Sequence, residues 1–321
     1  MNRDGIDHAF TSATDRGVWQ EPTYSGALSF MRRRYTKDLT DVDVAATGIP
    51  LDTATTNRPG ARFGPRAIRE ATPLLSWTRP YGWDFDPLEV LSIVDYGDCV
   101  WDHGRLETMP DTVTAHIGKI LEAGTAPLSM GGDHFITYPI LRALHAQHGP
   151  IALIHFDAHS DTWDDSDGDG RVDHGTMFYH AHKDGLVDSA CSAQVGIRTH
   201  NDDDWGFTIL DAPWVHRNGI EETVSRIRET VGDCKAYLTF DIDCLDPCFA
   251  PGTGTPVSGG LSTAEAIEIL KGLRGVNFVG MDIVEVAPAY DVGNITGLAA
   301  ATLAYHWLGL YASRPGGPAA V

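Results

Sequence analysis

The chain is short of cysteine and has no long apolar run. Its five cysteines, an odd number, show no Cys-x-x-Cys spacing, so we expect no disulfide framework and a reducing, cytoplasmic location. No run approaches the roughly 18 apolar residues of a membrane-spanning helix. The first twenty residues lack an apolar core and contain Asp4, Asp7 and Asp15, which is unlike a signal peptide.

Positive charge is also scarce. Lys and Arg number 24 against 44 Asp and Glu, which gives a formal net charge of -20. Nucleic acids and anionic membranes need clustered Lys and Arg, so neither is an expected partner. The acidic balance suits a small cationic ligand, although solubility explains it equally well. The hydrophobic content of 42% is ample for a core.

No internal repeat and no linker divides the chain. Short apolar runs alternate with helix-like segments, which predicts βα units and a mostly parallel sheet covered by helices on both faces. We expect an N-terminal arm at 1–40, a single domain at 41–312 and a flexible tail at 313–321. The expected strands are 42–48, 90–94, 127–130, 151–156, 193–197, 208–210, 236–240 and 278–286. The expected helices are 67–70, 112–123, 138–148, 220–231, 264–273 and 295–311.

Two short runs of metal-ligand residues follow two of these strands. Asp157, His159 and Asp161 come after the strand at 151–156, and Asp241 and Asp243 come after the strand at 236–240. Side chains at i and i+2 share a face if the chain stays extended, so each run can converge. Ligands in parallel sheets bind beyond the carboxyl ends of the strands, where both runs lie. The sequence therefore predicts a two-metal site.

A third candidate ligand, His134, ends the strand at 127–130 after two glycines, which permit a tight or close-packed backbone. A single histidine in a turn is more often structural, but the two other runs favour a metal ligand. His155 lies deeper in its strand and is assigned to the core. Two histidines and four carboxylates suit a pair of divalent ions such as Mn²⁺ better than a thiolate zinc site.

The charge of this ligand set constrains the substrate. Four aspartates balance two divalent ions, and a bridging hydroxide leaves the centre negative, so it should accept a cation. A two-metal phosphatase would need Arg or Lys to hold its phosphate, and none lies beside the ligand runs. A structural ion or a cluster of surface acids is the remaining alternative for these residues.

Three further features are ambiguous from the residues alone. Glu285 follows the apolar strand run at 278–284 and could accept a guanidinium, or it could be a rim acid paired with an arginine. His174 has the right side chain for a proton shuttle. The segment 165–173 matches the acidic positions and glycine of a calcium-binding loop, but Thr176 replaces the final glutamate, which favours an acidic surface loop.

In combination, these residues closely resemble the ureohydrolase family of arginases, agmatinases and other amidinohydrolases. The resemblance runs from about Asp43 to Leu310. It is carried by Met130-Gly-Gly-Asp-His134, Phe156-Asp-Ala-His-Ser-Asp161, Phe240-Asp-Ile-Asp-Cys-Leu-Asp-Pro247 and Gly252-Thr-Gly-Thr-Pro256. Bacterial agmatinases look nearest, through Arg58-Pro-Gly-Ala-Arg-Phe-Gly-Pro-Arg66, Asp173-His-Gly-Thr-Met-Phe178 and Val284-Glu-Val-Ala-Pro-Ala-Tyr-Asp291.

The resemblance implies a three-layer αβα sandwich, two Mn²⁺ ions per chain and a homo-oligomer, a hexamer or a trimer. Matched by motif, one ion would be held by His134, Asp157, Asp161 and Asp241, and the other by Asp157, His159, Asp241 and Asp243. Asp161 would also relay a proton. His174 matches the proton-shuttle or substrate-contact histidine of the family, and Glu285 its guanidinium-binding acid.

The activity implied is hydrolysis of agmatine to putrescine and urea, a step of polyamine biosynthesis. The loop at 163–169 offers acceptors for the ammonium of agmatine and few donors for a carboxylate. The loop also looks longer than in agmatinases, so guanidinobutyrate, guanidinopropionate, free guanidine and arginine remain alternative substrates, and Ni²⁺ an alternative metal.

Two other classes of protein compete with this prediction. A non-catalytic subunit should have a broken ligand set, whereas every expected ligand is present. A deacetylase-like amidohydrolase uses one zinc ion and would not need all six residues.

Overall fold

The computed structural model describes residues 7–18, 21–164, 168 and 170–320. Among these residues an eight-stranded sheet has the order β2-β1-β3-β8-β7-β4-β5-β6, with every pair of neighbours parallel. The prediction of a parallel α/β sheet is confirmed. The strands are β1 Val44–Ile49, β2 Ile93–Asp98, β3 Ala126–Gly131, β4 Ala152–Phe156, β5 Ala193–Val195, β6 Thr208–Leu210, β7 Ala236–Asp241 and β8 Phe278–Val284.

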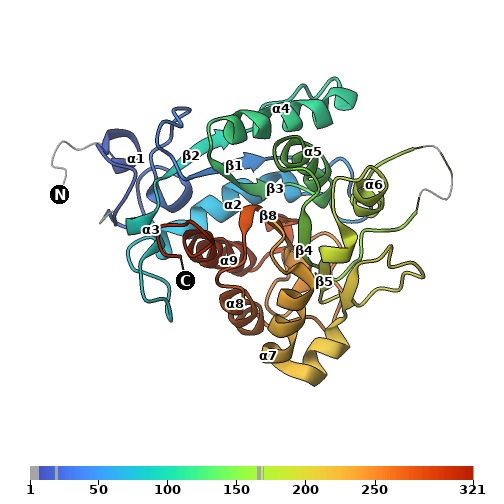
Figure 1. Cartoon of the computed structure of the whole chain (residues 1–321). Coiled ribbons are helices and arrows are strands. Elements are labelled where there is room, and N and C mark those ends of the chain that lie inside the picture. Colours follow the sequence, from blue (N-terminus) through green and yellow to red (C-terminus); the bar gives the residue numbers. More distant parts are fainter. Residues whose placement is uncertain (1–6, 19–20, 165–167, 169, 321) are drawn as a thin grey trace.

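Helices cover both faces of the sheet, so the fold has three layers (Figure 1). On one face pack α2 Gly64–Ala71, α7 Ala212–Val231, α8 Thr263–Gly272 and α9 Ile295–Ala312. On the other face pack α4 Met109–Glu122, α5 Thr137–His148 and α6 Met177–Lys183. Alternate side chains of the inner strands enter the two cores, as in Leu153 and Ile154 of β4, so these strands are apolar throughout.

The second strand begins later than the sequence predicted. Residues 90–94 were expected to be extended, but α3 Pro87–Val90 occupies the start of this segment, and β2 begins at Ile93. Asp86 caps α3 by accepting a hydrogen bond from the amide of Leu88, and Pro87 suits the first helical turn. A local helix start therefore overrides the apolar pattern.

The helix α7 is longer than its predicted range of 220–231. Asp211 caps its start by accepting a hydrogen bond from the Trp214 amide. Gly219, at φ 82°, interrupts the helical backbone, and the predicted range is the part after this break. Three short helices among the described residues, α1 His8–Thr11, α3 and α6, had no counterpart among the predicted helix ranges.

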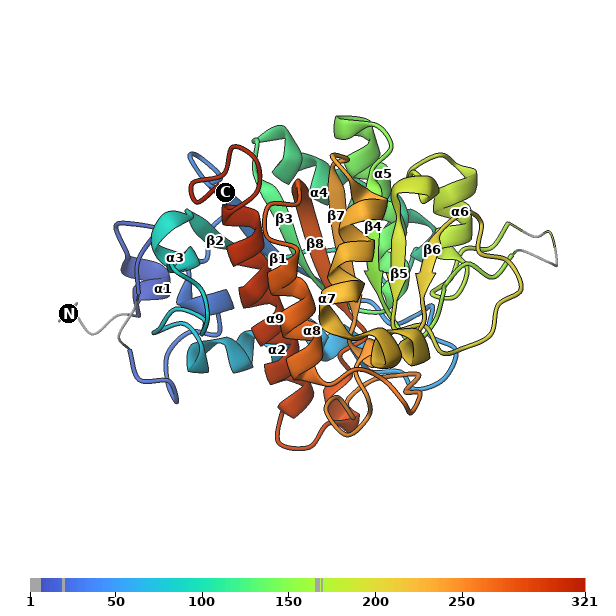
Figure 2. The same cartoon turned by 60° about the horizontal axis from the view of Figure 1, so that its bottom comes forward.

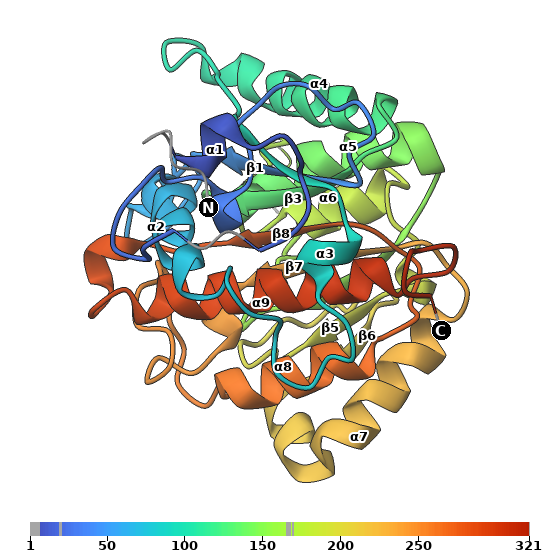
Figure 3. The ribbon, with the colours of Figure 1, turned by 90° about the vertical axis from the view of Figure 1, so that its left-hand side faces the viewer.

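The N-terminal segment packs against the edge strand β2, where Tyr35 pairs with Asp95, and lies near α2 (Figure 3). Arg33 is fully buried there and donates hydrogen bonds to the carbonyl oxygens of Met31 and Gly17. At the other end of the chain, the amide of Ala319 donates to the carbonyl of Ala312. The division into arm, domain and tail stays a prediction.

The order of the strands places β3, β8, β7 and β4 side by side at the centre of the sheet (Figure 2). Because β3 and β4 follow one another in the chain but are separated by β8 and β7, the connections diverge there and leave a crevice at the carboxyl ends.

In the described part of the chain no helix is long and apolar enough to span a bilayer.

Candidate metal centre

Each of the four central strands delivers predicted site residues at its carboxyl end. β3 leads to His134, β4 to the run beginning at Asp157, β7 to Asp241 and Asp243, and β8 to Glu285. The six predicted metal ligands come together there, five of them buried and His159 partly exposed.

His134 depends on the two glycines that precede it. At Gly132, where φ is +23°, a Cβ atom would lie 2.5 Å from the carbonyl oxygen of Ile49 and 2.7 Å from that of Leu51. At Gly131 a Cβ atom would lie 2.6 Å from the side chain of Val284. The chain can therefore turn closely against β1 and β8 only because both residues lack a side chain.

Three carboxylates surround one nitrogen of His134. Its Nδ1 atom lies 3.0 Å from Asp157 Oδ2, 3.0 Å from Asp161 Oδ2 and 3.3 Å from Asp241 Oδ2. Nδ1 is buried and has no hydrogen-bond partner in the part of the chain that the structure describes. A nitrogen lone pair and several carboxylate oxygens that converge in this way fit a divalent cation.

A second group shares Asp157 with the first. His159 Nδ1 lies 3.3 Å from Asp157 Oδ1 and 3.2 Å from Asp243 Oδ2. Two sets of side chains have the spacing of metal ligands, and the Asp157 carboxylate that they share fits two neighbouring ions. The sets are His134, His155, Asp157 and Asp161, and Asp157, His159 and Asp243. The donors are imidazole and carboxylate without a thiolate, which suits Mn²⁺ or Ni²⁺ chemically.

The ligand runs do not stay extended, contrary to the route by which we expected them to converge. Asp161 has a left-handed backbone with φ 52°. After Asp241 the chain enters a 3-10 turn, η7 Ile242–Cys244, in which the Asp243 amide donates to Asp241 Oδ1 over 2.8 Å. Tight local turns, rather than strand parity, aim Asp161 and Asp243 into the site.

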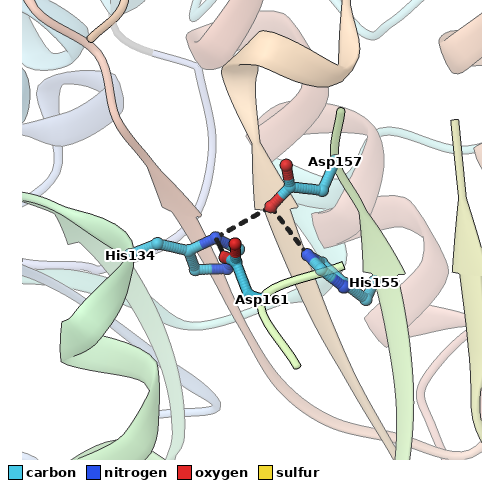
Figure 4. A group of neighbouring side chains, drawn as sticks. All are labelled: His134, His155, Asp157 and Asp161. Atoms are coloured by element: carbon cyan, nitrogen blue, oxygen red, sulfur yellow. Dashed lines mark hydrogen bonds and ion pairs between the residues drawn. The ribbon is translucent and has the colours of Figure 1, made fainter. Parts of the chain in front are cut away.

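His155 is fully buried, as its assignment to the core requires, but it also contacts the centre (Figure 4). Its Nε2 atom lies 2.8 Å from Asp157 Oδ2. The signal was present in the sequence, because His155 and Asp157 are two residues apart and share a face of the strand. We missed this contact to the shared carboxylate.

Burial and repulsion among carboxylates dominate the electrostatics of the cluster. Burial raises the pKa of Asp241 well above its ordinary value, and the charges of Asp243 and Asp157 add to the rise. Burial opposes ionisation of Asp157 as well, but the neighbouring imidazoles, His155 foremost, hold its pKa well below the usual range. Mutually repelling buried carboxylates favour a bound cation.

A buried polar network orients His134 from behind. Its Nε2 atom lies 2.8 Å from Thr239 Oγ1, which donates to Asp282 Oδ1 over 2.6 Å. Asp282 Oδ2 accepts from Thr137 and Tyr237 over 2.7 and 2.9 Å. Outer contacts of this kind fix the ring orientation of a ligating histidine.

Glu285 and His174 lie together beside the cluster. Glu285 Oε1 accepts a hydrogen bond from the His134 amide over 2.9 Å and lies 3.3 Å from His174 Nδ1. Glu285 Oε2 is buried and has no hydrogen-bond partner among the described residues, so it is a free acceptor. Glu285 also has a left-handed backbone with φ 62°; such strain concentrates at functional sites.

The protonation of His174 responds to opposing neighbours. Burial lowers its pKa, but the Glu285 carboxylate outweighs burial and raises the pKa to about 9. On the other side of the ring, Thr56 contacts Nε2 through its amide nitrogen at 3.0 Å and its hydroxyl at 2.9 Å. The amide can donate only to an unprotonated Nε2, so this contact favours the neutral ring.

A cavity that opens to solvent, with a volume of about 540 Å³, leads to the cluster. Among the described residues, no Lys or Arg lines this cavity. The lining residues are Thr56, His159, Asp161, Trp163, His174, Gly175, Asp241 and Thr255. Residues 165–167 and 169 of the predicted acidic loop lie outside the described residues.

The fold and this cluster together define an α/β protein with a side-chain set suited to two divalent metal ions. Comparison with known proteins identifies the family. The sequence profile of the arginase family matches residues 42–309, and the chain belongs to this family.

Individual relatives are similar over nearly the whole chain. The agmatinase of Chromobacterium violaceum is 54% identical over 295 residues, covering 92% of this chain and 91% of that protein. The agmatinase of Photorhabdus laumondii is 51% identical over 294 residues, with 90% and 94% coverage. The crystal structure of a hypothetical agmatinase from Burkholderia thailandensis has a TM-score of 0.93 at 53% identity, covering 95% of this chain and 97% of that chain.

A more distant structure has the same architecture. The proclavaminate amidino hydrolase of Streptomyces clavuligerus has a TM-score of 0.86 at 38% identity, covering 91% of this chain and 99% of that chain. The predicted ureohydrolase resemblance and αβα fold are therefore confirmed.

Proposed function

We propose that the chain is a metal-dependent hydrolase that converts agmatine to putrescine and urea. The observation that carries the proposal is its identity of 51 to 54% with the agmatinases of two bacteria over nine-tenths of the chain. We propose two Mn²⁺ ions per chain, with Ni²⁺ as the alternative metal.

The proposed ligand sets follow the two groups of side chains in the centre. We assign one ion to His134, Asp157, Asp161 and Asp241, and the other to Asp157, His159, Asp241 and Asp243, so that two aspartates bridge. The distances of 3.0 to 3.3 Å from the two imidazole Nδ1 atoms to these carboxylates support the assignment.

The chemistry needs activation, because a guanidinium is resonance-stabilised and its carbon is a poor electrophile. The two ions would supply Lewis acidity, which lowers the pKa of nearby water towards neutrality. Glu285 would hold the planar guanidinium, and its free buried Oε2 atom supports this role. Asp161 would pass a proton to the departing nitrogen, and His174 would exchange protons with solvent.

The cavity favours a substrate whose far end carries no negative charge. Arginine and guanidino acids end in a carboxylate, which needs cationic or hydrogen-bond donors, and the described residues that line the cavity include no Lys or Arg. Thr255 offers an oxygen acceptor, and Trp163 offers an aromatic ring, both of which suit the ammonium of agmatine.

Urea release from a substrate panel tests the proposal. Agmatine, arginine, guanidinobutyrate, guanidinopropionate and guanidine are compared with Mn²⁺ and with Ni²⁺. We expect kcat/KM to be highest for agmatine by a factor of about ten or more, which corresponds to roughly 1.4 kcal/mol of selective binding. Agmatine among the poor substrates would contradict the agmatinase assignment, and release from none of them would favour a non-catalytic subunit.

We also propose a homo-oligomer, a hexamer or a trimer. Exposed large apolar side chains support it, among them Leu74, Trp77 and Tyr81 at 56%, 60% and 96% exposure. Light scattering after size-exclusion chromatography gives the mass; a monomer would contradict the proposal.

Because the product is a diamine, we place the activity in polyamine biosynthesis, and we place the protein in the cytoplasm.

A further inference from the structure

Two cysteines lie close together at the amino ends of the strands, whereas the candidate metal centre lies at the carboxyl ends. Cys191 closes the short 3-10 helix η6 Ser189–Cys191, just before β5, and Cys234 lies between α7 and β7. Their Sγ atoms are 3.0 Å apart, about 1 Å longer than a disulfide bond of roughly 2.05 Å. Both side chains are partly accessible, and both are free thiols in this structure.

We propose that Cys191 and Cys234 form a dithiol site that a hydroperoxide converts to a disulfide. Packing of η6 against α7 brings the two sulfurs together, although 43 residues separate them in the chain. The remaining thiols are in different settings: Cys99 and Cys244 are buried, and Cys248 is exposed. This inference is independent of the proposed function.

The surroundings give the two thiols different roles. The Cys191 thiol lies 3.6 Å from Asp188 Oδ2. The contact with Cys234, burial and this carboxylate raise the pKa of Cys191 to about 12, so Cys191 stays protonated at neutral pH. Because Asp188 accepts a hydrogen bond from the Cys191 thiol, we assign Cys191 as the resolving thiol and Cys234 as the thiol that reacts first.

The reaction balances with the hydroperoxide as the oxidant. The Cys234 sulfur attacks one peroxide oxygen, the O–O bond breaks, and Cys234 becomes a sulfenic acid, while the departing hydroxide takes the proton of the Cys234 thiol and leaves as water. The Cys191 sulfur then attacks the Cys234 sulfur, the S–O bond breaks, and water leaves with the Cys191 proton. Two thiols and one H₂O₂ give one disulfide and two waters.

The bridge would join the amino ends of two strands that flank β4. In the sheet, β7 and β5 lie on either side of β4, and the candidate metal ligands lie at the carboxyl ends of β4 and β7. A disulfide there closes a long loop without touching the site. It should therefore raise thermal stability and leave turnover within about twofold, since loop closure mainly restricts the unfolded chain.

Peptide mapping of the full-length, metal-loaded protein tests the proposal. The protein is treated with H₂O₂, its remaining thiols are alkylated, and it is digested without reduction. We expect a cross-linked Cys191–Cys234 peptide, a fall from five to three titratable thiols per chain, and reversal by dithiothreitol. The melting temperature should rise by roughly 5 °C.

Cys191→Ser and Cys234→Ser should each lower the cross-linked peptide at least tenfold, whereas Cys248→Ser, the matched control, should leave it unchanged. Melting of the reduced variants near the temperature of the reduced parent shows that they are folded. Five thiols that survive the treatment, oxidation confined to Cys248, or cross-links that include Cys248 would overturn the proposal.

Discussion

At the scale of single residues, Asp243 is the clearest test of the two-metal assignment. Its carboxylate lies 3.2 Å from His159 Nδ1 and also accepts a hydrogen bond from the Ala158 amide, so it serves the second proposed ion. Asp243→Ala should give a folded protein with about one metal ion fewer per chain and urea release reduced about 100-fold or more. Metal analysis and circular dichroism measure the two properties separately.

Asp203→Ala removes the same charge from an exposed position and is the matched control. It should keep both ions and full activity. Near-normal hydrolysis by Asp243→Ala would contradict the two-metal assignment.

Thr56 is a positioning residue that acts through His174. Its hydroxyl lies 2.9 Å from His174 Nε2, and removal of this contact leaves Nε2 held by the Thr56 amide alone, so the ring is less firmly oriented. Thr56→Val should lower kcat roughly tenfold with KM changed less than about twofold, and shift the pH profile of kcat, while Thr56→Ser restores both.

The neighbouring Thr55 donates its hydroxyl to the Asp52 carbonyl in the same loop, so Thr55→Val is the control. A merely structural role for Thr56 predicts equal losses of melting temperature in both variants and an unshifted pH profile. That outcome would refute the positioning role.

The residues that could be predicted from the sequence are those whose spacing follows a strand end. Asp157 and His159 follow β4 and Asp241 is the last residue of β7, where an apolar run marks the position. The contacts of Thr56 could not be predicted, because 118 residues separate it from His174 and only the folded loop brings them together. The contact of His155 with Asp157 was not predicted, because a histidine inside an apolar strand is equally typical of a core residue.

At the scale of elements, the turn after β3 should be destabilised by the addition of a single methyl group at Gly132. An alanine at 132 would meet two backbone carbonyls that cannot move aside. Gly132→Ala should destabilise the fold by about 3 kcal/mol or more and lower metal content, because His134 follows the turn. Chemical denaturation measures the free energy of unfolding.

Gly118, inside α4, has open space around the position of a Cβ atom and is the matched control. Gly118→Ala should be neutral or stabilise the protein by up to about 1 kcal/mol. If both alanines have the same effect, close packing is not what requires glycine at 132.

The contact between α9 and the segment before α3 predicts a pH dependence of stability. Burial lowers the pKa of His306 to about 4, and its Nδ1 atom accepts a hydrogen bond from Trp83 Nε1 over 3.0 Å. In the unfolded chain the pKa is about 6.5, so the unfolded state binds more protons between these values. This contribution, about 3 kcal/mol, is complete above pH 6.5 and is lost as the pH falls towards 4.

His306→Gln keeps an acceptor for Trp83 but cannot titrate. Unfolding measured from pH 4 to 7 should show a shallower dependence of stability on pH in this variant than in the parent. His200→Gln, at an exposed ring, should leave the slope unchanged. An unchanged slope in His306→Gln would rule out the buried histidine as its source.

The elements also separate what local patterns can predict from what they cannot. Long periodic helices such as α5 and α8 were expected within one or two residues of their observed bounds. The start of β2 was misplaced, because the cap at Asp86 is a hydrogen bond of one side chain and leaves no periodic signal. The η7 turn after Asp241 was missed because it is only three residues long.

At the scale of the whole molecule, the order of the strands explains how distant segments of the chain form one site. Four adjacent strands end together, and they carry ligands from segments more than one hundred residues apart. The alternation of strands and helices predicts a parallel sheet but does not give the order of its strands. That order, with β8 and β7 between β3 and β4, depends on packing across both cores.

The net charge of -20 predicts how the rate should respond to salt. Agmatine carries two positive charges at neutral pH, so the field of the protein should raise its local concentration, and screening should weaken this effect. Between about 0.01 and 0.15 M NaCl, kcat/KM for agmatine should fall roughly three- to tenfold. Butylguanidine, which has one charge and the same reactive group, should show a weaker dependence. Metal content measured at each salt concentration separates screening from metal loss, and a rate for agmatine that is constant or rises with salt would contradict electrostatic attraction as a source of its efficiency.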